Sequence, residues 1–269
     1  YSNFPLKVLT DKGTWQSFDS GSTSKSKPSG KLVVDYNGNQ WFAIAASGLF
    51  GYNTNNTIDN ISDDKKLHLN MGENSGSLPS NQVTALAVDF DNRLWIGTDN
   101  GFAILYNASG AFDSADPVNA QRPKLEFEGN VEYVLGNTHI TAIEVDGGNR
   151  KWIGTSSAGA ILLSPDGLEI IRQFTVDNSP LISNNIMDIE IDHKTGEVYF
   201  VTDQGLISYR SDASYQDPNY SEVNVFPNPA RPEFEGPITI QGIKYNSDVK
   251  INYVALYLVY ITISYGCTG

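Results

Sequence analysis

The chain has 269 residues with 31 acidic and 18 basic side chains, which gives a formal net charge of −13. This balance excludes nucleic acid as a partner, because phosphate binding needs clustered Lys and Arg. The 24 glycines and 14 tyrosines suit many short strands and tight turns around a large core. Cys267 is the single cysteine, so no internal disulfide forms and cysteine usage does not indicate a redox compartment.

The N-terminal residues predict an incomplete structural unit. Two short strands are expected over residues 6–9 and 14–18, with a turn between them. Residues 1–20 therefore look like the outer strands of a unit whose inner hairpin is missing. Residues 21–30 (GSTSKSKPSG) are a connector that is flexible by composition. The chain begins at Tyr1 without a charged-then-apolar leader, which indicates a mature or truncated product.

Four segments then repeat one pattern, beginning at residues 31, 83, 140 and 186. Aligning them superimposes an aspartate, an aromatic residue and a glycine. The aligned residues are Asp35, Asp89, Asp146 and Asp192; Trp41, Trp95, Trp152 and Tyr199; and Gly48, Gly101, Gly159 and Gly205. The aspartates are 46–57 residues apart, a period typical of a propeller or a solenoid rather than of independent domains.

The second repeat shows how one unit is expected to fold. Over residues 84–89, Leu86 and Val88 alternate with smaller or polar residues, which is the period of a strand with two distinct faces. A turn follows, in which left-handed backbone angles are tolerated. The residue pairs expected to adopt them in the four repeats are Asn37-Gly38, Asp91-Asn92, Gly147-Gly148 and Thr195-Gly196.

A second strand over residues 94–98 places Trp95 in a packing layer between sheets. Next to it, Gly97 allows a neighbouring sheet to approach closely, and Ala43 and Gly154 take its place in other repeats. A third strand is expected over residues 102–106. Each repeat is therefore an antiparallel meander of three strands plus a weaker fourth, which is one blade of a β-propeller.

The sequence predicts an all-β chain of about four and a half propeller blades followed by a small β-sandwich module. We expect the blades to belong to a larger ring of the seven-bladed type, with the missing blades upstream of Tyr1. Blade 2 carries a polar insertion over residues 108–123 that we place on the rim. The predicted boundaries are 1–20 for the partial blade, 31–74, 83–128, 140–175 and 186–210 for blades 1 to 4, 211–222 for a linker and 223–269 for the module.

The repeats resemble the two-component-regulator propeller repeat, in which an apolar strand, an Asp and a turn precede Leu-Trp-Ile-Gly-Thr. Residues 94–98 (LWIGT) and 151–155 (KWIGT) fit this pattern closely, while residues 41–44 and 199–202 are degenerate. The resemblance covers residues 31–209 and implies the propeller fold. It does not imply one function, because such propellers occur both in sensor kinases and in secretion-associated surface proteins.

The C-terminal residues distinguish these two uses. Residues 223–242 (VNVFPNPARPEFEGPITIQG) predict a strand, a Pro-Asn-Pro turn, a second turn and a strand over 238–241, which would open a small β-sandwich. This segment is similar to the C-terminal module of the PorZ-type family of the type IX secretion system. The resemblance implies a protein of the cell surface that works with the sortase PorU and PorV, is docked on the outer membrane through a PorQ-like protein and binds anionic lipopolysaccharide.

After residue 250 the chain departs from that family, because the expected turn glycine is missing. Residues 251–263 are apolar, but a membrane-spanning helix needs about 20 residues. Their Tyr, Val, Ile and Thr content favours strands. We therefore expect no transmembrane segment in the second half of the module.

No catalytic, cofactor-binding or metal-binding constellation is recognisable, and no binding residue can be named. His68, His139 and His193 each lack a second His or Cys at ligand spacing. Residues 89–92 (DFDN) are half of a calcium loop at most, and a hairpin turn is the preferred interpretation. Trp95 and Trp152 would suit sugar stacking, but their repetition in one strand position favours core packing.

The sequence therefore predicts a non-enzymatic interaction protein of the type IX secretion machinery, located at the cell surface and associated with the outer membrane. The alternative is the periplasmic propeller sensor domain of a hybrid two-component system that binds a glycan. A lyase of the streptogramin type would be an enzymatic alternative, but its clustered catalytic histidine is missing from the sequence.

Overall fold

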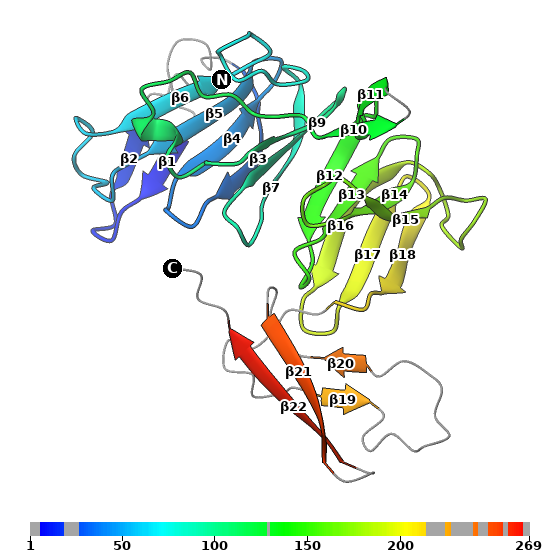
Figure 1. The fold of residues 1–269 in the computed structure, drawn as a ribbon. Helices are drawn as coiled ribbons and strands as arrows, with labels where there is room; N and C mark the ends of the chain where they lie inside the picture. The colour runs from blue at the N-terminus through cyan, green and yellow to red at the C-terminus, as the bar shows by residue number, and fades with distance from the viewer. Residues whose placement is uncertain are drawn as a thin grey trace.

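A computed structural model describes residues 6–18, 27–127, 130–213, 224–226, 239–241, 247–254 and 258–265 (Figure 1). Within these ranges the chain forms strands, turns and one short 3-10 helix, η2 (Ala111–Asp113), and it contains no α-helix. The all-β prediction is confirmed. Most of the connector over 21–30 and of the linker over 211–222 lies outside the described residues, as do Tyr1, Cys267 and the Pro-Asn-Pro segment.

Four antiparallel sheets follow the four sequence repeats, and we call them blades 1 to 4. Blade 1 consists of β3 (Ser29–Val34), β4 (Gln40–Ile44), β5 (Gly48–Asn53) and β6 (Lys65–Leu69). Blade 2 consists of β7 (Val83–Val88), β8 (Leu94–Thr98) and β9 (Gly101–Leu105). Blade 3 consists of β12 (Ile140–Val145), β13 (Lys151–Thr155), β14 (Ala160–Leu163) and β15 (Ile170–Phe174). Blade 4 consists of β16 (Ile186–Asp192), β17 (Glu197–Thr202) and β18 (Gly205–Arg210).

Eight further strands pair as four separate hairpins. They are β1 (Leu6–Leu9) with β2 (Trp15–Phe18), β10 (Lys124–Phe127) with β11 (Asn130–Tyr133), β19 (Asn224–Phe226) with β20 (Thr239–Gln241), and β21 (Ser247–Val254) with β22 (Leu258–Tyr265). The last two pairs show that the described C-terminal residues form strands, and β21 and β22 include most of the residues that are apolar enough to suggest a membrane helix. The β-sandwich itself stays a prediction.

The blades stack face to face in sequence order. Their first strands lie at the centre, with β3 beside β7, β7 beside β12 and β12 beside β16, while the later strands lie toward the periphery (Figure 1). This is the radial arrangement of propeller blades. The number of blades in the intact ring stays a prediction.

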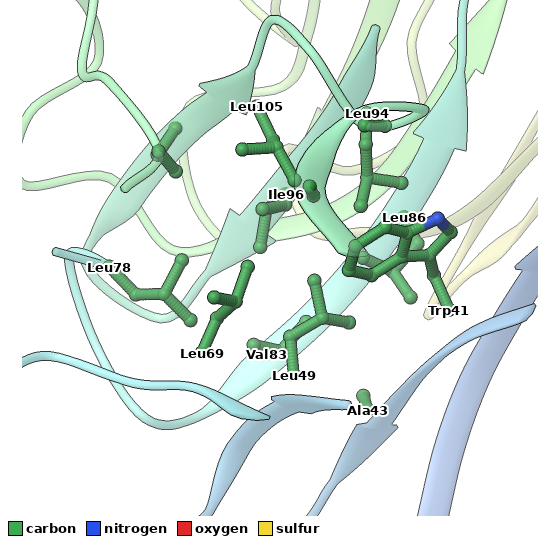
Figure 2. Packing of buried hydrophobic residues seen from close by; sticks show 14 residues of the cluster. Trp41, Ala43, Leu49, Leu69, Leu78, Val83, Leu86, Leu94, Ile96 and Leu105 are labelled. Carbon is green, nitrogen blue, oxygen red and sulfur yellow. The ribbon is translucent and has the colours of Figure 1, made fainter. Parts of the chain in front are cut away.

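Each interface between neighbouring blades is filled by one apolar cluster. Trp41 of blade 1 packs against blade 2, as Figure 2 shows, together with Leu86 and Ile96 from that blade. Trp95 of blade 2 packs in the same way with residues of blade 3, and Trp152 of blade 3 with residues of blade 4. All three tryptophans are fully buried. The prediction that Trp95 and Trp152 pack between sheets rather than stack on sugars is confirmed.

The alternation predicted for the first strand explains why blade 2 has two buried faces. Leu86 and the partly buried Val88 of β7 lie in the cluster shared with blade 1. Ala85 and Ala87 lie in the cluster shared with blade 3. Both faces of the blade are apolar. Each face is covered by a neighbouring sheet, so neither is exposed to water.

Small residues in the second strands set the distance between blades. A Cβ atom added to Gly97 would lie 2.7 Å from Cγ2 of Ile140 in blade 3, and one added to Gly154 would lie 2.9 Å from Cγ2 of Ile186 in blade 4. Contacts that short do not occur between carbon atoms without displacement. The prediction of a close approach at these positions is confirmed.

The insertion predicted on the rim of blade 2 is also part of the core. The Phe112 ring of η2 lies 5.2 Å from the Trp41 ring, and Ala108, Ala111 and Ala120 are buried in the cluster between blades 1 and 2. The prediction considered only the polar composition of the insertion. Its alanines and Phe112 help to fill the interface between blades 1 and 2.

One turn geometry recurs between the first two strands of blades 1, 2 and 3. In blade 2, Asp89 Oδ1 accepts the N–H groups of Asp91 and Arg93 at 3.0 and 2.9 Å, and Oδ2 accepts Trp95 Nε1 at 2.9 Å. Asp35 makes the equivalent bonds to two turn N–H groups and to Trp41 Nε1. One buried carboxylate thus closes the turn and holds the tryptophan of the next strand.

The left-handed residue of this turn is the third after the aspartate. It is Gly38 in blade 1, Asn92 in blade 2 and Asn149 in blade 3, with φ of 83°, 58° and 57°. The prediction was right for blades 1 and 2 and also for blade 4, where Gly196 has a φ of 74°, and wrong for blade 3, where Gly147-Gly148 were expected. The turn register, not the presence of glycine, decides which residue is left-handed, and Asn tolerates that conformation.

Blade 3 departs from this pattern at its tryptophan. Arg150 Nε donates to Asp146 Oδ2 at 2.8 Å and takes the place that the indole has in blades 1 and 2. The Trp152 ring instead packs against Phe174, Phe200 and Tyr209, and its buried Nε1 has no hydrogen-bond partner.

This difference predicts unequal costs for two matched substitutions. Trp95→Phe removes a buried hydrogen bond to a carboxylate, whereas Trp152→Phe removes no hydrogen bond. We expect Trp95→Phe to cost about 1.5–3 kcal/mol more in the free energy of unfolding. Chemical denaturation of both variants measures this difference, and equal costs would contradict the assigned hydrogen bonds.

Candidate functional site

Asparagine side chains connect the turns at one end of the blades. Asn92 Oδ1 accepts the N–H of Tyr36 in the preceding blade at 2.9 Å, and Asn92 Nδ2 donates to Asn37 Oδ1 at 2.9 Å. Asn149 repeats this arrangement, since its Oδ1 accepts the N–H of Phe90 at 3.0 Å and its Nδ2 donates to Asp91 Oδ2 at 3.2 Å. These polar groups satisfy one another, so they form a structural ladder rather than a binding site.

A lysine is fully buried between blades 2 and 3. Lys151 Nζ lies 2.8 Å from Asp89 Oδ2 and donates to the carbonyl oxygens of Asn149 and Pro165 at 2.8 and 2.9 Å. It also lies 4.5 Å from the centre of the Trp95 ring. Burial lowers the pKa of Lys151, and the Asp89 carboxylate opposes that shift. With three oxygen partners and a ring face around it, this ammonium is fully coordinated and has a structural role.

The ion pair makes Asp89 more sensitive to substitution than its counterpart Asp35. Asp89→Asn leaves the Lys151 ammonium buried without a counter-ion, which costs about 3–5 kcal/mol. Asp35→Asn is the control, because Asp35 forms no ion pair with a described residue. Urea denaturation should show the larger loss for Asp89→Asn and a partial recovery in Asp89→Asn combined with Lys151→Met. Equal losses for the two single variants would exclude an energetic role for the ion pair.

Acidic side chains gather where blades 3 and 4 meet near the centre. Burial, followed by the nearby carboxylates of Glu190 and Asp188, raises the pKa of Glu144 to about 7, and Lys31 of blade 1 partly opposes the shift. Lys31 Nζ lies 3.4 Å from Asp188 Oδ1 and links β3 to β16. Glu144 therefore changes its charge near neutral pH.

This carboxyl predicts a pH dependence of stability. Between pH 4.5 and 7 the folded chain keeps the Glu144 proton that the unfolded chain has already released, so stability falls as the pH rises. We expect the free energy of unfolding of the wild type to fall by about 1–3 kcal/mol across this interval, and that of Glu144→Gln not to show this fall. Urea denaturation at pH 5, 6, 7 and 8 tests this, with Glu132→Gln as the exposed control. Parallel curves for the wild type and Glu144→Gln would contradict the raised pKa.

The three histidines lie apart from one another. His68 is on β6, where its ring stacks on Phe50 and its Nε2 lies 2.5 Å from the carbonyl oxygen of Ser47. His139 and His193 are exposed. Among the described residues, no three His, Cys, Asp or Glu side chains are grouped so that they could hold a metal ion.

The loop over residues 89–92 is a hairpin turn in the structure. Asp89 is saturated by two backbone N–H groups, Trp95 and Lys151. A carboxylate that already has these donors is not available to coordinate a cation. The structure thus supports the turn over the calcium loop.

Two hollows differ in size and polarity. One lies between β15, β17 and β18, has a volume of about 150 Å³ and is lined mainly by apolar side chains, among them Phe174, Leu181, Ile207 and Tyr209. It is smaller than the 300–1,000 Å³ typical of ligand sites. The other has a volume of about 480 Å³ and mixed polarity. It is the better candidate for a binding site.

The larger hollow, which we call the rim pocket, is formed by four parts of the chain, one of which is the segment before β7 with Ser77. Its main side chains are Tyr106 after β9; Gln121, Arg122, Lys124 and Tyr133 from the β10–β11 region; and Leu168 from the turn before β15. The pocket thus lies where the outer part of blade 2 meets blade 3. The sequence pattern gave no sign of Gln121, Arg122, Lys124 and Tyr133, because they lie between the last strand of blade 2 and the first strand of blade 3, a part of the chain that does not repeat.

The arginine of the rim pocket is held from two sides. Its guanidinium lies 4.0 Å from the centre of the Tyr133 ring, and Arg122 Nη2 donates to the carbonyl oxygen of Gly136 at 2.7 Å. Arg122 Nε is buried without a hydrogen-bond partner. An unpaired buried donor costs about 1–3 kcal/mol, and such groups are uncommon outside functional or strained sites.

Comparison with known proteins agrees with the repeat pattern. The family model described as two component regulator propeller matches residues 77–100, which include β7 and β8. The chain carries a two component regulator propeller repeat. No curated protein matches the chain.

Solved structures extend the similarity over most of the chain. PorZ, an essential bacterial surface component of the type IX secretion system of Porphyromonas gingivalis, is 32% identical with a TM-score of 0.69. That alignment covers 94% of this chain and 35% of the PorZ chain. The chain therefore spans about a third of the length of PorZ. The predicted resemblances to the propeller repeat and to PorZ are both confirmed.

Two extracellular domains of B. thetaiotaomicron proteins share the fold at lower identity. The domain of BT3049, described as a hybrid two component system, is 20% identical with a TM-score of 0.52, and the alignment covers 86% of this chain and 30% of that one. The domain of BT4673 is 15% identical with a TM-score of 0.52, and the alignment covers 95% of this chain and 39% of that one. At these identities the likeness shows the fold alone.

No helix in the described part of the chain has the length and apolar character needed to cross a membrane.

Proposed function

We propose that the chain is part of a non-enzymatic cell-surface component of a type IX secretion system. In this role it helps a sortase complex attach secreted cargo to anionic lipopolysaccharide at the outer membrane, with PorU-, PorV- and PorQ-like proteins as partners. The observation that carries the proposal is the similarity to PorZ, at 32% identity over 94% of the chain.

The C-terminal strands support this choice over a sensor. β19 and β20 lie on either side of the Pro-Asn-Pro segment that resembles the PorZ-type module, and they pair with each other from Asn224↔Gln241 to Phe226↔Thr239. The central interfaces of the blades are filled by side chains, and the carboxylates of the recurring turns are occupied by donors. The blades thus support a scaffold for interactions rather than a catalytic centre.

The alternative is the periplasmic sensor domain of a hybrid two-component system that binds a glycan. It is favoured by the shared fold of the BT3049 extracellular domain, which is part of such a system. At 20% identity this comparison supports the alternative less than the PorZ comparison supports the secretion role.

Deleting residues 221–269 from the gene in the source organism tests the proposal. We expect secreted cargo to lose its attachment to the cell surface and to accumulate in the medium, because the C-terminal module would no longer engage the surface machinery. Fractionation followed by immunoblotting of cargo measures this. A matched strain with Glu132→Gln, an exposed substitution on β11, serves as the control for expression.

Affinity purification from solubilised outer membranes gives a second measurement. Co-purification of sortase and outer-membrane attachment proteins with the wild type, and not with the deletion, supports the secretion role. Unchanged cargo attachment, together with altered transcription of glycan-utilisation genes, would instead support the sensor alternative.

A further inference from the structure

The outer edge of blade 4 is open in the described part of the chain. The third strands of blades 1 and 3 pair on their outer side with β6 and β15. In blade 2 the outer side of β9 pairs at Ile104 with Gln121. No described residue pairs with the outer side of β18. This strand therefore presents unused backbone groups to which another strand can bind.

The backbone groups of β18 that point outward follow from its pairing with β17. The N–H of Ser211 donates to the carbonyl oxygen of Gly196 at 2.9 Å, so these residues form a hydrogen-bonded pair at the end of the two strands. Hydrogen-bonded and non-hydrogen-bonded pairs alternate along an antiparallel ladder. The N–H and C=O groups of Leu206, Ser208 and Arg210 consequently point away from β17, toward the open edge.

The chain itself turns away from this edge after β18. Arg150 Nη2 donates to Ser211 Oγ at 3.2 Å and to Asp212 Oδ1 at 2.7 Å. The carbonyl oxygen of Ala213 lies next to Gly196, since a Cβ atom added there would be 2.9 Å from it. Arg150 and Gly196 belong to turns between first and second strands, whereas the open edge is on a third strand. The later described strands pair with one another, so they do not cover it either.

An apolar hollow, which we call the apolar slot, lies beside the same strand. It is the hollow of about 150 Å³ between β15, β17 and β18, and its lining includes Phe174, Leu181, Phe200, Ile207 and Tyr209. A cavity of this volume with an apolar lining takes up a group of the size of benzene. The slot is too small for a whole ligand, but it suits one large apolar side chain.

Blade 2 shows what fills the equivalent position there. The segment after β9 pairs with the outer side of that strand, because Ile104 and Gln121 exchange two N–H···O bonds of 2.8 Å. The same segment places the Phe112 ring 5.2 Å from the Trp41 ring, in the interface with blade 1. One segment thus supplies both a paired backbone and an aromatic side chain. Blade 4 has the matching edge and slot without such a segment among the described residues.

A cation lies at the apolar slot. The Arg172 guanidinium of β15 is 5.9 and 5.6 Å from the centres of the Phe174 and Tyr209 rings. Arg172 is exposed and forms no ion pair with a described residue. In a chain with a net charge of −13, a cation without a counter-ion favours an acidic group beside the side chain that fills the slot.

A second copy of the chain does not supply the missing segment. Its β18 would bring Ile207 and Tyr209 to the side of the slot, but both are packed in the apolar cluster between blades 3 and 4 of their own chain. The Tyr209 ring lies 4.8 Å from the Phe174 ring of the same chain. No side chain on that side of the strand is then free to enter a neighbouring slot, so the occupant is a different protein.

We propose that the outer edge of blade 4 is a docking site for an extended segment of a partner protein, which adds a fourth strand to β18. One aromatic or large aliphatic side chain of the segment enters the apolar slot, and an acidic residue two positions away contacts Arg172. β18 has 6 residues, so a partner segment of the same length covers it. The proposal does not rest on the secretion role, because it follows from blade 4 itself.

Fluorescence anisotropy with synthetic peptides tests the proposal on the full chain. The probe is a labelled, end-blocked heptapeptide, Thr-Glu-Thr-Phe-Thr-Glu-Thr, in which Phe and both Glu lie on one face of a strand. We expect the same peptide with Ser in place of Phe to bind at least about tenfold more weakly, because a buried phenyl group is lost. Gln in place of both Glu should weaken binding about two- to fivefold, as for an exposed ion pair.

N-methylated peptides distinguish strand addition from simple insertion of the Phe side chain. One peptide carries methyl groups on the backbone nitrogens of Phe and both Glu, and the other on those of the two Thr that flank Phe. Alternate residues of an added strand direct their N–H groups toward β18. We therefore expect one of the two peptides to bind at least about tenfold more weakly and the other to bind like the unmodified probe.

Substitutions in the chain assign the binding to β18. Ser208→Pro removes an outward N–H without breaking a bond to β17, which an edge strand tolerates. It should weaken the probe at least about tenfold, whereas Ser208→Ala, which keeps the N–H, should bind like the wild type. Both variants should unfold at the wild-type temperature. If Ser208→Pro does not fold, the N-methylated peptides make the same test on the wild type.

A second pair of substitutions tests the acidic residue of the partner. Arg172→Gln should abolish the difference in affinity between the Glu and Gln peptides. Arg210→Gln is the matched control, because Arg210 is an exposed arginine on the same strand as Tyr209 but on its opposite face. It should keep the difference.

Three results would overturn the proposal. The first is that the probe does not bind up to about 1 mM, which is weaker than specific recognition requires. The second is that both N-methylated peptides bind as tightly as the unmodified probe, since no strand would then be added. The third is that the wild type dimerises in analytical ultracentrifugation and Ser208→Pro does not, because the edge would then join two copies of this chain.

Discussion

The architecture depends on a buried aspartate carboxylate that binds the turn and the second strand of the same blade. In blades 1 and 2 the aspartate after the first strand binds the N–H groups of the turn with one oxygen and the indole of the second strand with the other. Because the same carboxylate fixes the turn and the tryptophan, the large ring enters the inter-blade space in one orientation. Hydrogen bonds to a charged acceptor are stronger than neutral ones, and burial increases their contribution further.

Successive blades are then aligned by packing and by polar contacts between turns. Gly97 and Gly154 allow the sheets to approach until the tryptophans are covered, and the asparagines at the left-handed positions bond back to the preceding turn. Packing sets the spacing and the asparagine ladder sets the register. The arginine and lysine of the rim pocket lie outside both of these devices.

The repeated part of this structure could be predicted from the sequence, and the unrepeated part could not. The strands, the buried tryptophans and the close approach at Gly97 could be predicted because the residues responsible for each feature recur at the same position in several repeats. The left-handed Asn149 was missed because glycine is the usual sign of that conformation. Lys151 occupies the position of Leu94 in the repeat alignment, and this mismatch was the one available signal of a buried charge. Phe112 and the rim pocket gave no such signal, since a single copy has nothing to be compared with.

The Lys151–Asp89 pair also constrains how such a chain can evolve by rearranging its blades. Blade 3 carries a charge that only blade 2 can neutralise. If blade 3 were moved to follow blade 1, Lys151 would face Asp35, whose Oδ2 already accepts Asn39 Nδ2 at 2.8 Å and Trp41 Nε1 at 3.1 Å. Blades with purely apolar interfaces could exchange places, whereas blades 2 and 3 would have to move together to keep the Lys151–Asp89 ion pair. The buried ion pair therefore requires blade 3 to follow blade 2 directly.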